Sequence, residues 1–213
     1  MIGPGRRRPL RRRRLLGSAL ALAGVAGLGL ARGRHEQARP DAARALRPPG
    51  AVPEGQFDAA CVRCGLCVQA CPFGSLRLAG DGAPVAIGTP FFVPRETPCA
   101  MCADLPCQRA CPTGALGSPA LRITDARMGL ASLSRAAACY SYIGAAACNS
   151  CFKACPLRGR AITMKRGLTA AGGQLTPTVD AAVCTGCGLC EKACIASQPA
   201  ITVATRRPPA GTA

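Results

Sequence analysis

The hydrophobic residues form one long run near the N-terminus and, beyond it, only short clusters between turn-forming residues. The run covers residues 15–31 and consists mainly of Leu, Ala and Gly. The short clusters flank cysteine-rich segments and predict β-strands at 75–79, 90–94, 121–124, 160–164, 176–180 and 199–203. A brief helix is expected to follow the third cysteine of each cysteine-rich segment, as at 69–71 and 192–194. The pattern predicts an α+β fold of short strands and short helices.

Composition indicates that hydrophobic burial alone does not hold this fold together. Of the 213 residues 49% are hydrophobic, but only 3% are aromatic, and Ala, Gly and Cys supply much of the apolar fraction. A large close-packed core is therefore not expected. The 16 Cys are the residues expected to stabilise the fold in its place. This composition argues against an ordinary α/β enzyme, a coiled coil or a polytopic membrane protein.

The N-terminus reads as an export segment. Arg12 and Arg13 precede Leu15 and Leu16, and the moderately apolar run follows. A basic region before such a run is typical of a secretory signal, and the arginine pair resembles a twin-arginine (Tat) signal. Residues 1–31 are therefore predicted to be this signal or, if uncleaved, a membrane anchor; a simple transmembrane helix is the alternative. Because the Tat route carries folded proteins, it favours metal-bound cysteines over disulfides.

The sequence predicts unstructured segments on both sides of the cysteine-rich region. Residues 32–55 contain mainly Ala, Arg and Pro without apolar periodicity, and they read as a linker. Residues 204–213 read as a flexible tail. The folded domain is therefore expected to span residues 56–203.

The sixteen cysteines fall into four groups of four, separated by 28, 28 and 29 positions. The repeat is typical of an internal duplication. The first and fourth groups share the spacing C-x2-C-x2-C-x3-C, the second widens its middle gap to four residues, and the third widens its first gap to eight. The groups are Cys61, Cys64, Cys67, Cys71; Cys99, Cys102, Cys107, Cys111; Cys139, Cys148, Cys151, Cys155; and Cys184, Cys187, Cys190, Cys194.

This spacing matches bacterial ferredoxins, in which three close thiolates hold one [4Fe-4S] cube and the fourth ligates another. Gly65 and Gly188 lie inside tight loops, where the backbone has to pass close to sulfide. Proline follows the last cysteine of three groups, whereas Ile195 follows that of the fourth. All sixteen cysteines are therefore predicted as iron ligands of four [4Fe-4S] clusters, with zinc sites or disulfides as alternatives. Cys139, after its long gap, has the further alternative of a buried structural thiol.

The fold prediction is tandem bacterial-type 2[4Fe-4S] ferredoxin modules with short strands and helices around the clusters. Two pairings of the groups are open. The nested one joins the first group with the fourth and the second with the third, and it is favoured because the altered spacings then fall together. The sequential one joins the first with the second and the third with the fourth.

The formal net charge of +17 does not indicate a nucleic-acid-binding protein. Residues 1–31 contain seven Arg and no acidic residue, so the rest of the chain carries 20 basic and 10 acidic side chains. Four clusters with their thiolates, at about −2 each, reduce that remainder to roughly +2. The few aromatic residues also supply no stacking platform for bases. Arg63, Arg109, Lys153 and Lys192 read as solvated surface or as a basic rim for an acidic partner.

The Arg12–Arg13 signal, the order of the groups, their altered gaps and the stretch Cys111–Leu116 together resemble the NapG/MauM ferredoxin-type proteins. The resemblance covers most of residues 11–203. It implies a periplasmic, membrane-associated electron carrier with four [4Fe-4S] clusters. It also implies an integral membrane iron-sulfur partner of the NapH or MauN type, which passes electrons from quinol toward a periplasmic cytochrome or terminal oxidoreductase. Arg11 and Ile195 depart from the family pattern.

The sequence offers no paired carboxylates, phosphate loop or catalytic histidine, so an electron carrier is predicted and not an enzyme. The alternative within the same class is the four-cluster electron-transfer subunit of a molybdopterin oxidoreductase or hydrogenase. The alternative from another class is a secreted disulfide-rich binding or structural protein.

Overall fold

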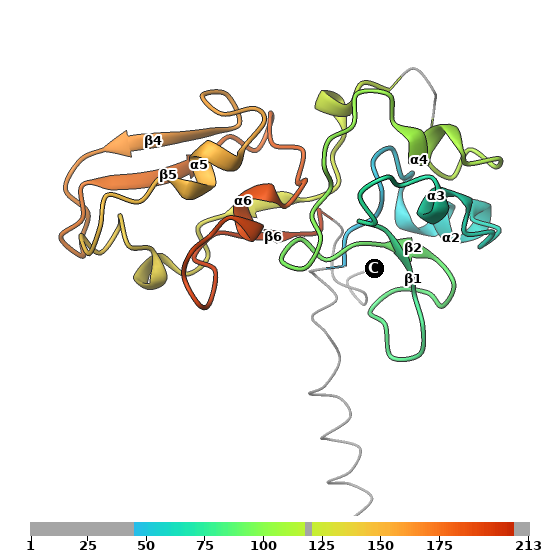
Figure 1. Cartoon of the computed structure of the whole chain (residues 1–213), viewed down its shortest axis with the longest axis horizontal. Helices are drawn as coiled ribbons and strands as arrows, with labels where there is room; N and C mark the ends of the chain where they lie inside the picture. The colour runs from blue at the N-terminus through green and yellow to red at the C-terminus, as the bar shows by residue number, and fades with distance from the viewer. Residues whose placement is uncertain (1–44, 118–120, 207–213) are drawn as a thin grey trace, which may run out of the picture. The chain divides into compact units, whose positions relative to one another are not determined.

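The computed structural model describes residues 45–117 and 121–206. Its elements are short, so the fold mixes small helices and strands as predicted (Figure 1). In chain order they are α2 (Glu54–Ala60), α3 (Leu66–Gln69), β1 (Arg77–Leu78), β2 (Pro90–Phe91), α4 (Pro106–Arg109), the 3-10 turn η2 (Ile123–Asp125), β3 (Leu130–Ser132), the 3-10 turn η3 (Ala136–Ala138), α5 (Ser150–Ala154), β4 (Ile162–Arg166), β5 (Leu175–Val179), α6 (Leu189–Lys192) and β6 (Thr202–Ala204).

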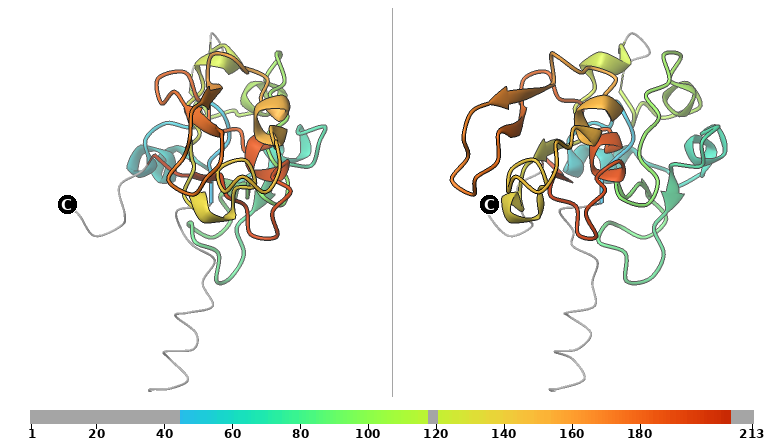
Figure 2. Two further views of the ribbon diagram at one scale, coloured as in Figure 1. Left: turned by 90° about the vertical axis from the view of Figure 1, so that its left-hand side faces the viewer. Right: turned by 60° about the vertical axis from the view of Figure 1, so that its left-hand side comes forward.

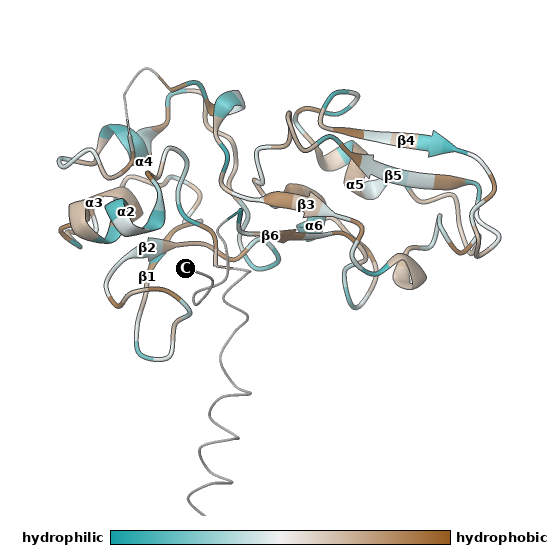
Figure 3. Cartoon of the chain, turned by 180° about the vertical axis from the view of Figure 1, so that it is seen from behind, coloured by the Kyte–Doolittle hydropathy of each residue, from teal (hydrophilic) through white to brown (hydrophobic). Residues whose placement is uncertain are grey.

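The strands of the described residues pair as three antiparallel ladders. β1 pairs with β2 and β4 with β5, so each of these ladders joins strands that are close in sequence. β3 pairs with β6, with Ala131 opposite Val203. Figure 3 shows these two strands in apolar colours and the end of β4, which contains Lys165 and Arg166, in hydrophilic ones. The third ladder therefore ties the middle of the chain to its last described strand.

Each short helix carries the third cysteine of its group, rather than following it as predicted. Cys67 lies in α3, Cys107 in α4, Cys151 in α5 and Cys190 in α6. α3 packs against α4, and α5 packs against α6 (Figures 1 and 2). The helix pairs therefore bring adjacent cysteine groups together.

The core has few large side chains, as the composition indicated. Leu46, Phe57, Phe92, Leu116 and Ile201 are essentially inaccessible to solvent. Six cysteines belong to the same buried cluster: Cys67, Cys107, Cys151, Cys184, Cys187 and Cys190. Thiols therefore take the place that aliphatic side chains occupy in an ordinary core.

The prediction that residues 32–55 form a linker is wrong for residues 45–55. Leu46 pairs with Phe92 through two backbone hydrogen bonds of 2.9 and 2.8 Å. Arg47 is buried, lies 4.4 Å from the centroid of the Phe57 ring and forms an ion pair with Glu54. Because two side chains and one bridge fix this segment, a low content of apolar residues does not leave it loose. Residues 32–44 lie outside the described part.

Two further boundaries differ from the prediction. The strand expected at 121–124 is the 3-10 turn η2, because the Asp125 amide donates to the Arg122 carbonyl at 2.9 Å and closes a turn. The tail expected from residue 204 is wrong for residues 204–206: Ala204 belongs to β6, and the Arg206 guanidinium donates to the Gly129, Ala181 and Cys184 carbonyls. Residues 207–213 lie outside the described part.

The predicted export segment, residues 1–31, also lies outside the described part. Within residues 45–117 and 121–206, no helix has the length and apolar character needed to cross a bilayer.

Candidate cluster sites

The sixteen cysteines surround four cavities in the described part of the chain. Their empty volumes, which include space open to solvent, are similar at about 340 to 410 Å³. Cavity A is lined by Cys61, Cys64, Cys67 and Cys111. Cavity B is lined by Cys71, Cys99, Cys102 and Cys107. Cavity C is lined by Cys155, Cys184, Cys187 and Cys190. Cavity D is lined by Cys139, Cys148, Cys151 and Cys194.

Each cavity combines three cysteines of one group with the last cysteine of the neighbouring group. The first and second groups share cavities A and B, and the third and fourth share C and D. The nested pairing favoured from the sequence is therefore wrong, and the sequential one is correct. The physical reason is the packing of α3 on α4 and of α5 on α6, which carries each last cysteine into the adjacent cavity. We call residues 45–117 module one and residues 121–206 module two.

Left-handed backbone conformations shape the loops around cavities A and C. The third and fifth loop residues have positive φ in both: 58° at Arg63 and 76° at Gly65 for A, and 75° at Gly186 and 90° at Gly188 for C. Alternation of right- and left-handed residues turns successive amide N–H groups toward one side, which makes a concave site for anions, including iron-sulfur clusters. The loops are thus prepared for a negatively charged occupant.

The second group reaches the same form without glycine. Met101 has φ of 62°, and Leu105, the N-cap residue immediately before α4, has φ of 46°. A non-glycine residue in this region costs roughly 1 kcal/mol or more. The strain lies beside Cys99, Cys102 and Cys107, where a loop has to wrap cavity B.

The third group places Cys139 with the other thiols despite its long gap. Cys139 follows η3 and lines cavity D with Cys148 and Cys151. The intervening loop packs against the β4–β5 turn, where the Gly173 amide donates to the Tyr142 carbonyl at 3.0 Å. The eight-residue gap is therefore filled by a packed loop that returns the chain to the cavity.

The last cysteine of each group in module one receives hydrogen bonds from the residues that follow it. The Ser75 amide donates to Cys71 Sγ at 3.3 Å, and Thr113 Oγ1 lies 3.7 Å from Cys111 Sγ. Burial acts to raise the pKa of Cys71 and Cys111, but the neighbouring donors outweigh it, so both pKa values are lowered. In module two the Ala200 amide donates to Cys194 Sγ at 3.3 Å.

Burial dominates at the helical cysteines and at Cys99. It raises the pKa of Cys67, Cys107 and Cys151 to about 11 and that of Cys99 to about 12, with neighbouring thiols adding to the effect. Such thiols lose their protons readily only beside a strong positive charge, and a coordinating metal supplies one. Four converging thiols around one cavity therefore fit an iron-sulfur cluster.

The four basic residues considered as solvated surface or as a basic rim all lie at the surface, as both interpretations require. Arg63, Arg109, Lys153 and Lys192 are exposed. Arg63 also lines cavity A, and Lys192 Nζ donates to the Glu96 carbonyl at 2.9 Å.

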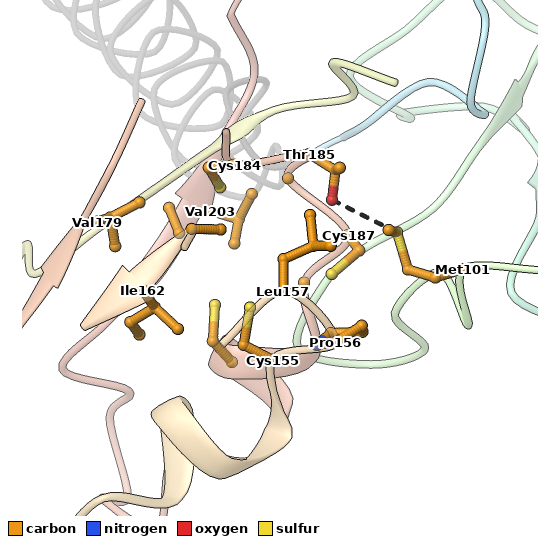
Figure 4. Close-up of a pocket in the computed structure, with 15 residues that line it drawn as sticks. Met101, Cys155, Pro156, Leu157, Ile162, Val179, Cys184, Thr185, Cys187 and Val203 are labelled. Atoms are coloured by element: carbon orange, nitrogen blue, oxygen red, sulfur yellow. Dashed lines mark hydrogen bonds between the residues drawn. The ribbon is translucent and has the colours of Figure 1, made fainter. Parts of the chain in front are cut away.

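Sequence reasoning missed Met101 and Thr185, which both line cavity C. Met101 belongs to the loop around B but lines C, and Thr185 Oγ1 lies 3.4 Å from its Sδ (Figure 4). Met101 is adjacent in sequence to Cys102, and Thr185 is adjacent to Cys184. This proximity to the cysteines is the sequence signal that could have identified them.

Comparison with known protein families gives two matches to the same family model, described as a 4Fe-4S dicluster domain. The matches cover residues 60–115 and 146–197. One contains all eight cysteines of the first two groups, and the other contains all of the last two groups except Cys139, as the sequential pairing requires. Tandem [4Fe-4S] modules with an α+β fold, as predicted, are thereby confirmed.

Similar proteins cover most of the chain. The methylamine utilization ferredoxin-type protein MauM of Methylorubrum extorquens is 50% identical over 92% of this chain and 89% of its own length. MauM of Paracoccus denitrificans is 49% identical over 94% of this chain and 90% of its own length. The ferredoxin-type protein NapG of Escherichia coli is 45% identical over 90% of this chain and 84% of its own length.

These matches decide between the classes that the sequence left open, because they extend over both modules and all four cavities. They exclude a disulfide-rich binding protein and identify an electron carrier in place of a catalytic enzyme. The chain belongs to the NapG/MauM family of ferredoxin-type electron-transfer proteins.

Proposed function

We propose that the chain holds four [4Fe-4S] clusters, one in each of cavities A to D, with all sixteen cysteines as ligands. The observation that carries this proposal is the arrangement of the thiols as four complete quartets around cavities of similar size. When bound, such clusters supply reversible one-electron transfer. The protein holds them, excludes water and sets the local charge.

The four cavities form a series in the order A, B, C, D. α3 lines A and packs against α4, which lines B, while α6 lines C and packs against α5, which lines D. B and C meet at the contact between the modules, where the Cys99 amide donates to the Cys187 carbonyl at 2.9 Å. A series of this kind suits a relay with cavities A and D at its ends.

The relay is proposed to operate in the periplasm, at the membrane. The twin arginines Arg12 and Arg13 before an apolar run support export with the cofactors already inserted. The proposed electron donor is an integral membrane iron-sulfur protein of the NapH or MauN type. The proposed acceptor is a periplasmic cytochrome or terminal oxidoreductase, in keeping with the MauM and NapG relatives.

Iron analysis of anaerobically purified full-length protein tests the cluster proposal. We expect about 16 Fe per chain and a broad absorption band at about 400 nm that dithionite bleaches. A protein with about 8 Fe per chain and eight alkylatable thiols would overturn the four-cluster assignment while leaving the family intact.

Cell fractionation tests the location. We expect periplasmic or membrane-bound protein from the natural sequence and cytoplasmic retention of the double variant Arg12→Lys, Arg13→Lys. The matched control is Arg7→Lys, Arg8→Lys, which changes the same residue type outside the pair. Equal export of both double variants would contradict the twin-arginine route.

A further inference from the structure

Basic and acidic side chains are divided unevenly between the two modules. Module one contains five of each, whereas module two contains ten basic and three acidic residues. Residues 126–179 include seven basic residues, all exposed, and no acidic residue. Two clusters with their thiolates, at about −2 each, bring module one to about −4 and module two to about +3. The two modules therefore carry opposite charge.

Cavity D lies at the basic end of the molecule. Figure 1 shows α5, β4 and β5 at the opposite end of the described part from α3 and α4, and Figure 3 agrees. The lining of D includes Cys151 of α5 and Pro177 of β5. D is also the last cavity of the proposed series. A redox partner that approaches this end of the relay therefore meets the surface around D.

Two exposed apolar side chains reach from cavity D to solvent. Ile195 and Tyr140 both line the cavity, yet 60% and 38% of their surfaces are accessible. Protein interfaces commonly have an apolar centre inside a polar rim, and weak electron-transfer complexes are small, at less than about 1,200 Å² of buried surface. Ile195 and Tyr140 supply the centre of such an interface.

Basic side chains lie beside this apolar centre. Lys153 belongs to α5 and is two residues from Cys151, which lines D. The Arg135 guanidinium donates to the Pro199 carbonyl at 3.1 Å, next to Ala200 in the lining. Both basic side chains are exposed. They therefore place positive charge at the mouth of the cavity.

The strand β4 adds a third basic side chain. Met164 pairs with Pro177, which lines cavity D. Because alternate residues share one face of a strand, Arg166 lies on the same face as Met164. We call Arg135, Lys153 and Arg166 the D rim. None of the ion pairs in the part of the chain that the structure describes includes a residue of the D rim, so its charge is directed to solvent.

The surface around cavity A differs in charge, although it also has an exposed apolar residue. Val62 lines A and is 62% exposed, and Arg63 supplies a positive charge. However, α2, whose Phe57 lines A, carries the carboxylates Glu54 and Asp58. Positive and negative side chains are therefore mixed at this end, and only the D end favours a partner of one charge.

We propose that the surface around cavity D docks a soluble redox protein whose cofactor edge is surrounded by acidic side chains. The inference rests on the proposed function and deepens it, because it assigns the acceptor of the relay to the D end. Opposite charges steer the encounter, and the apolar centre allows close contact. One electron leaves a reduced cluster in D and converts one ferric haem of a cytochrome acceptor to the ferrous state, with no bond made or broken.

An anionic lipid surface would also attract the D rim, but it holds no cofactor that receives an electron. Ile195 and Tyr140 are at once exposed and part of the lining of a cluster cavity. That position suits contact with a redox protein better than anchoring to lipid.

Stopped-flow reduction of cytochromes by anaerobic full-length protein tests the inference. The protein is reduced with dithionite, and the excess is removed. The probes are a lysine-rich c-type cytochrome and the same cytochrome with its lysines succinylated, which replaces each positive charge with a negative one and keeps the haem. At low ionic strength we expect the acidic probe to react about tenfold or more faster than the basic one. The difference is expected to shrink at about 0.15 M salt.

Charge reversal in the D rim separates this surface from the rest of the molecule. Lys153→Glu and Arg166→Glu are each expected to lower the rate with the acidic probe by roughly threefold to tenfold and to raise the rate with the basic probe. The matched control is Arg109→Glu. Arg109 is exposed and lies two residues after Cys107 in α4, as Lys153 does after Cys151 in α5. This control is expected to change either rate by less than about twofold.

Equal effects of Lys153→Glu and Arg109→Glu would overturn the inference, because net charge and not the D rim would then set the rate. Unchanged rates in both reversal variants would also overturn it, and weaker binding of these variants to phosphatidylglycerol vesicles would then assign the surface to lipid. With about 16 Fe per chain, either result leaves the proposed function standing. Natural protein with about 8 Fe per chain would instead refute the proposed function.

Discussion

The loops around cavities A and C have the same cysteine spacing and the same pattern of positive φ, but their surroundings differ. In the A loop Cys64 is exposed, and Val62 has 62% of its surface accessible. In the C loop Cys184, Cys187 and Cys190 are all buried, and Thr185, the counterpart of Val62, is 3% exposed. One sequence pattern therefore forms both an open site and a closed one.

Contacts with a distant segment of the same chain cause this difference in exposure. A Cβ on Gly186 would lie 2.2 Å from the Gly129 amide nitrogen, whereas the equivalent position in the A loop holds the full side chain of Arg63. Solvent exposure is one of the main determinants of cluster potential. The comparison teaches that cysteine spacing fixes the ligand geometry, while contacts distant in sequence fix the water access on which the potential depends.

Removal of the exchanged cysteine has the largest expected effect on this comparison. Cys155→Ser is expected to lose about four Fe, because the other three cysteines of cavity C are buried and a replacement water would have to be desolvated beside them. Cys111→Ser is expected to lose less from cavity A, where a solvent molecule can take the vacated position. Iron analysis and alkylation of free thiols measure both.

Double variants show which cavity each cysteine serves. Adding Cys187→Ser to Cys155→Ser is expected to release little further iron, since both residues line cavity C, whereas adding Cys148→Ser, which changes cavity D, is expected to release about four more. The reverse result would contradict the sequential pairing.

Substitution of Gly186 has the next largest expected effect. Gly186→Ala forces a Cβ into the Gly129 backbone and places a side chain at φ of 75°, so we expect a cost of about 3 kcal/mol or more. Arg63→Ala, the same final residue at the equivalent open position, is expected to have little effect. Anaerobic thermal denaturation, followed at the cluster absorption band, measures both, and similar midpoints would remove the proposed cause of the difference.

Substitution of Arg95 tests how module one contributes to the closure of the C loop. Its guanidinium donates to four carbonyls around the end of α6, including Glu191 at 2.7 Å and Cys194 at 2.8 Å. Arg95→Met is expected to cost about 2 kcal/mol and to lower the denaturation midpoint by roughly 4 to 8 °C. The control Arg77→Met breaks an exposed ion pair with Glu96 and is expected to cost less than about 1 kcal/mol. Equal costs would show that the four carbonyls do not depend on Arg95.

Ile195→Pro is expected to have the smallest effect. Ile195 is 60% exposed, and proline occupies the equivalent position in the other three groups. We expect the free energy of unfolding to change by no more than about 0.5 kcal/mol. A larger loss of stability, seen in the same thermal assay, would show that this loop differs from the others in backbone conformation.

The cysteine spacing predicted that three cysteines of each group share a cavity with the last cysteine of another group, but not which groups exchange that cysteine. Spacing within a group reports how a loop wraps its own cavity, so the altered gaps before Cys107 and Cys148 carry no information about the partner group. The entropy cost of loop closure favours the sequential pairing. Joining the first group with the fourth would instead close a loop of more than a hundred residues. Five of the six predicted strands overlap an observed one, since β-prone clusters there coincide with paired neighbours.

The remaining misses concern contacts between distant segments. Leu46 is buried because Phe92 pairs with it, and the closed C loop depends on Gly129 and Pro94. Such contacts follow from packing, and a local pattern of apolar residues does not encode them.

The pairing of β3 with β6 has a consequence for synthesis on the ribosome. β1 and β2 of module one are complete once residue 91 has emerged, whereas β3 waits for Thr202–Ala204, the last strand described. Chains grow from the N-terminus, so module one is able to fold and receive iron during translation, while the final ladder of module two forms only afterwards. Maturation of the protein is thus directional, and a nascent chain halted near residue 200 would carry one finished module and one open one.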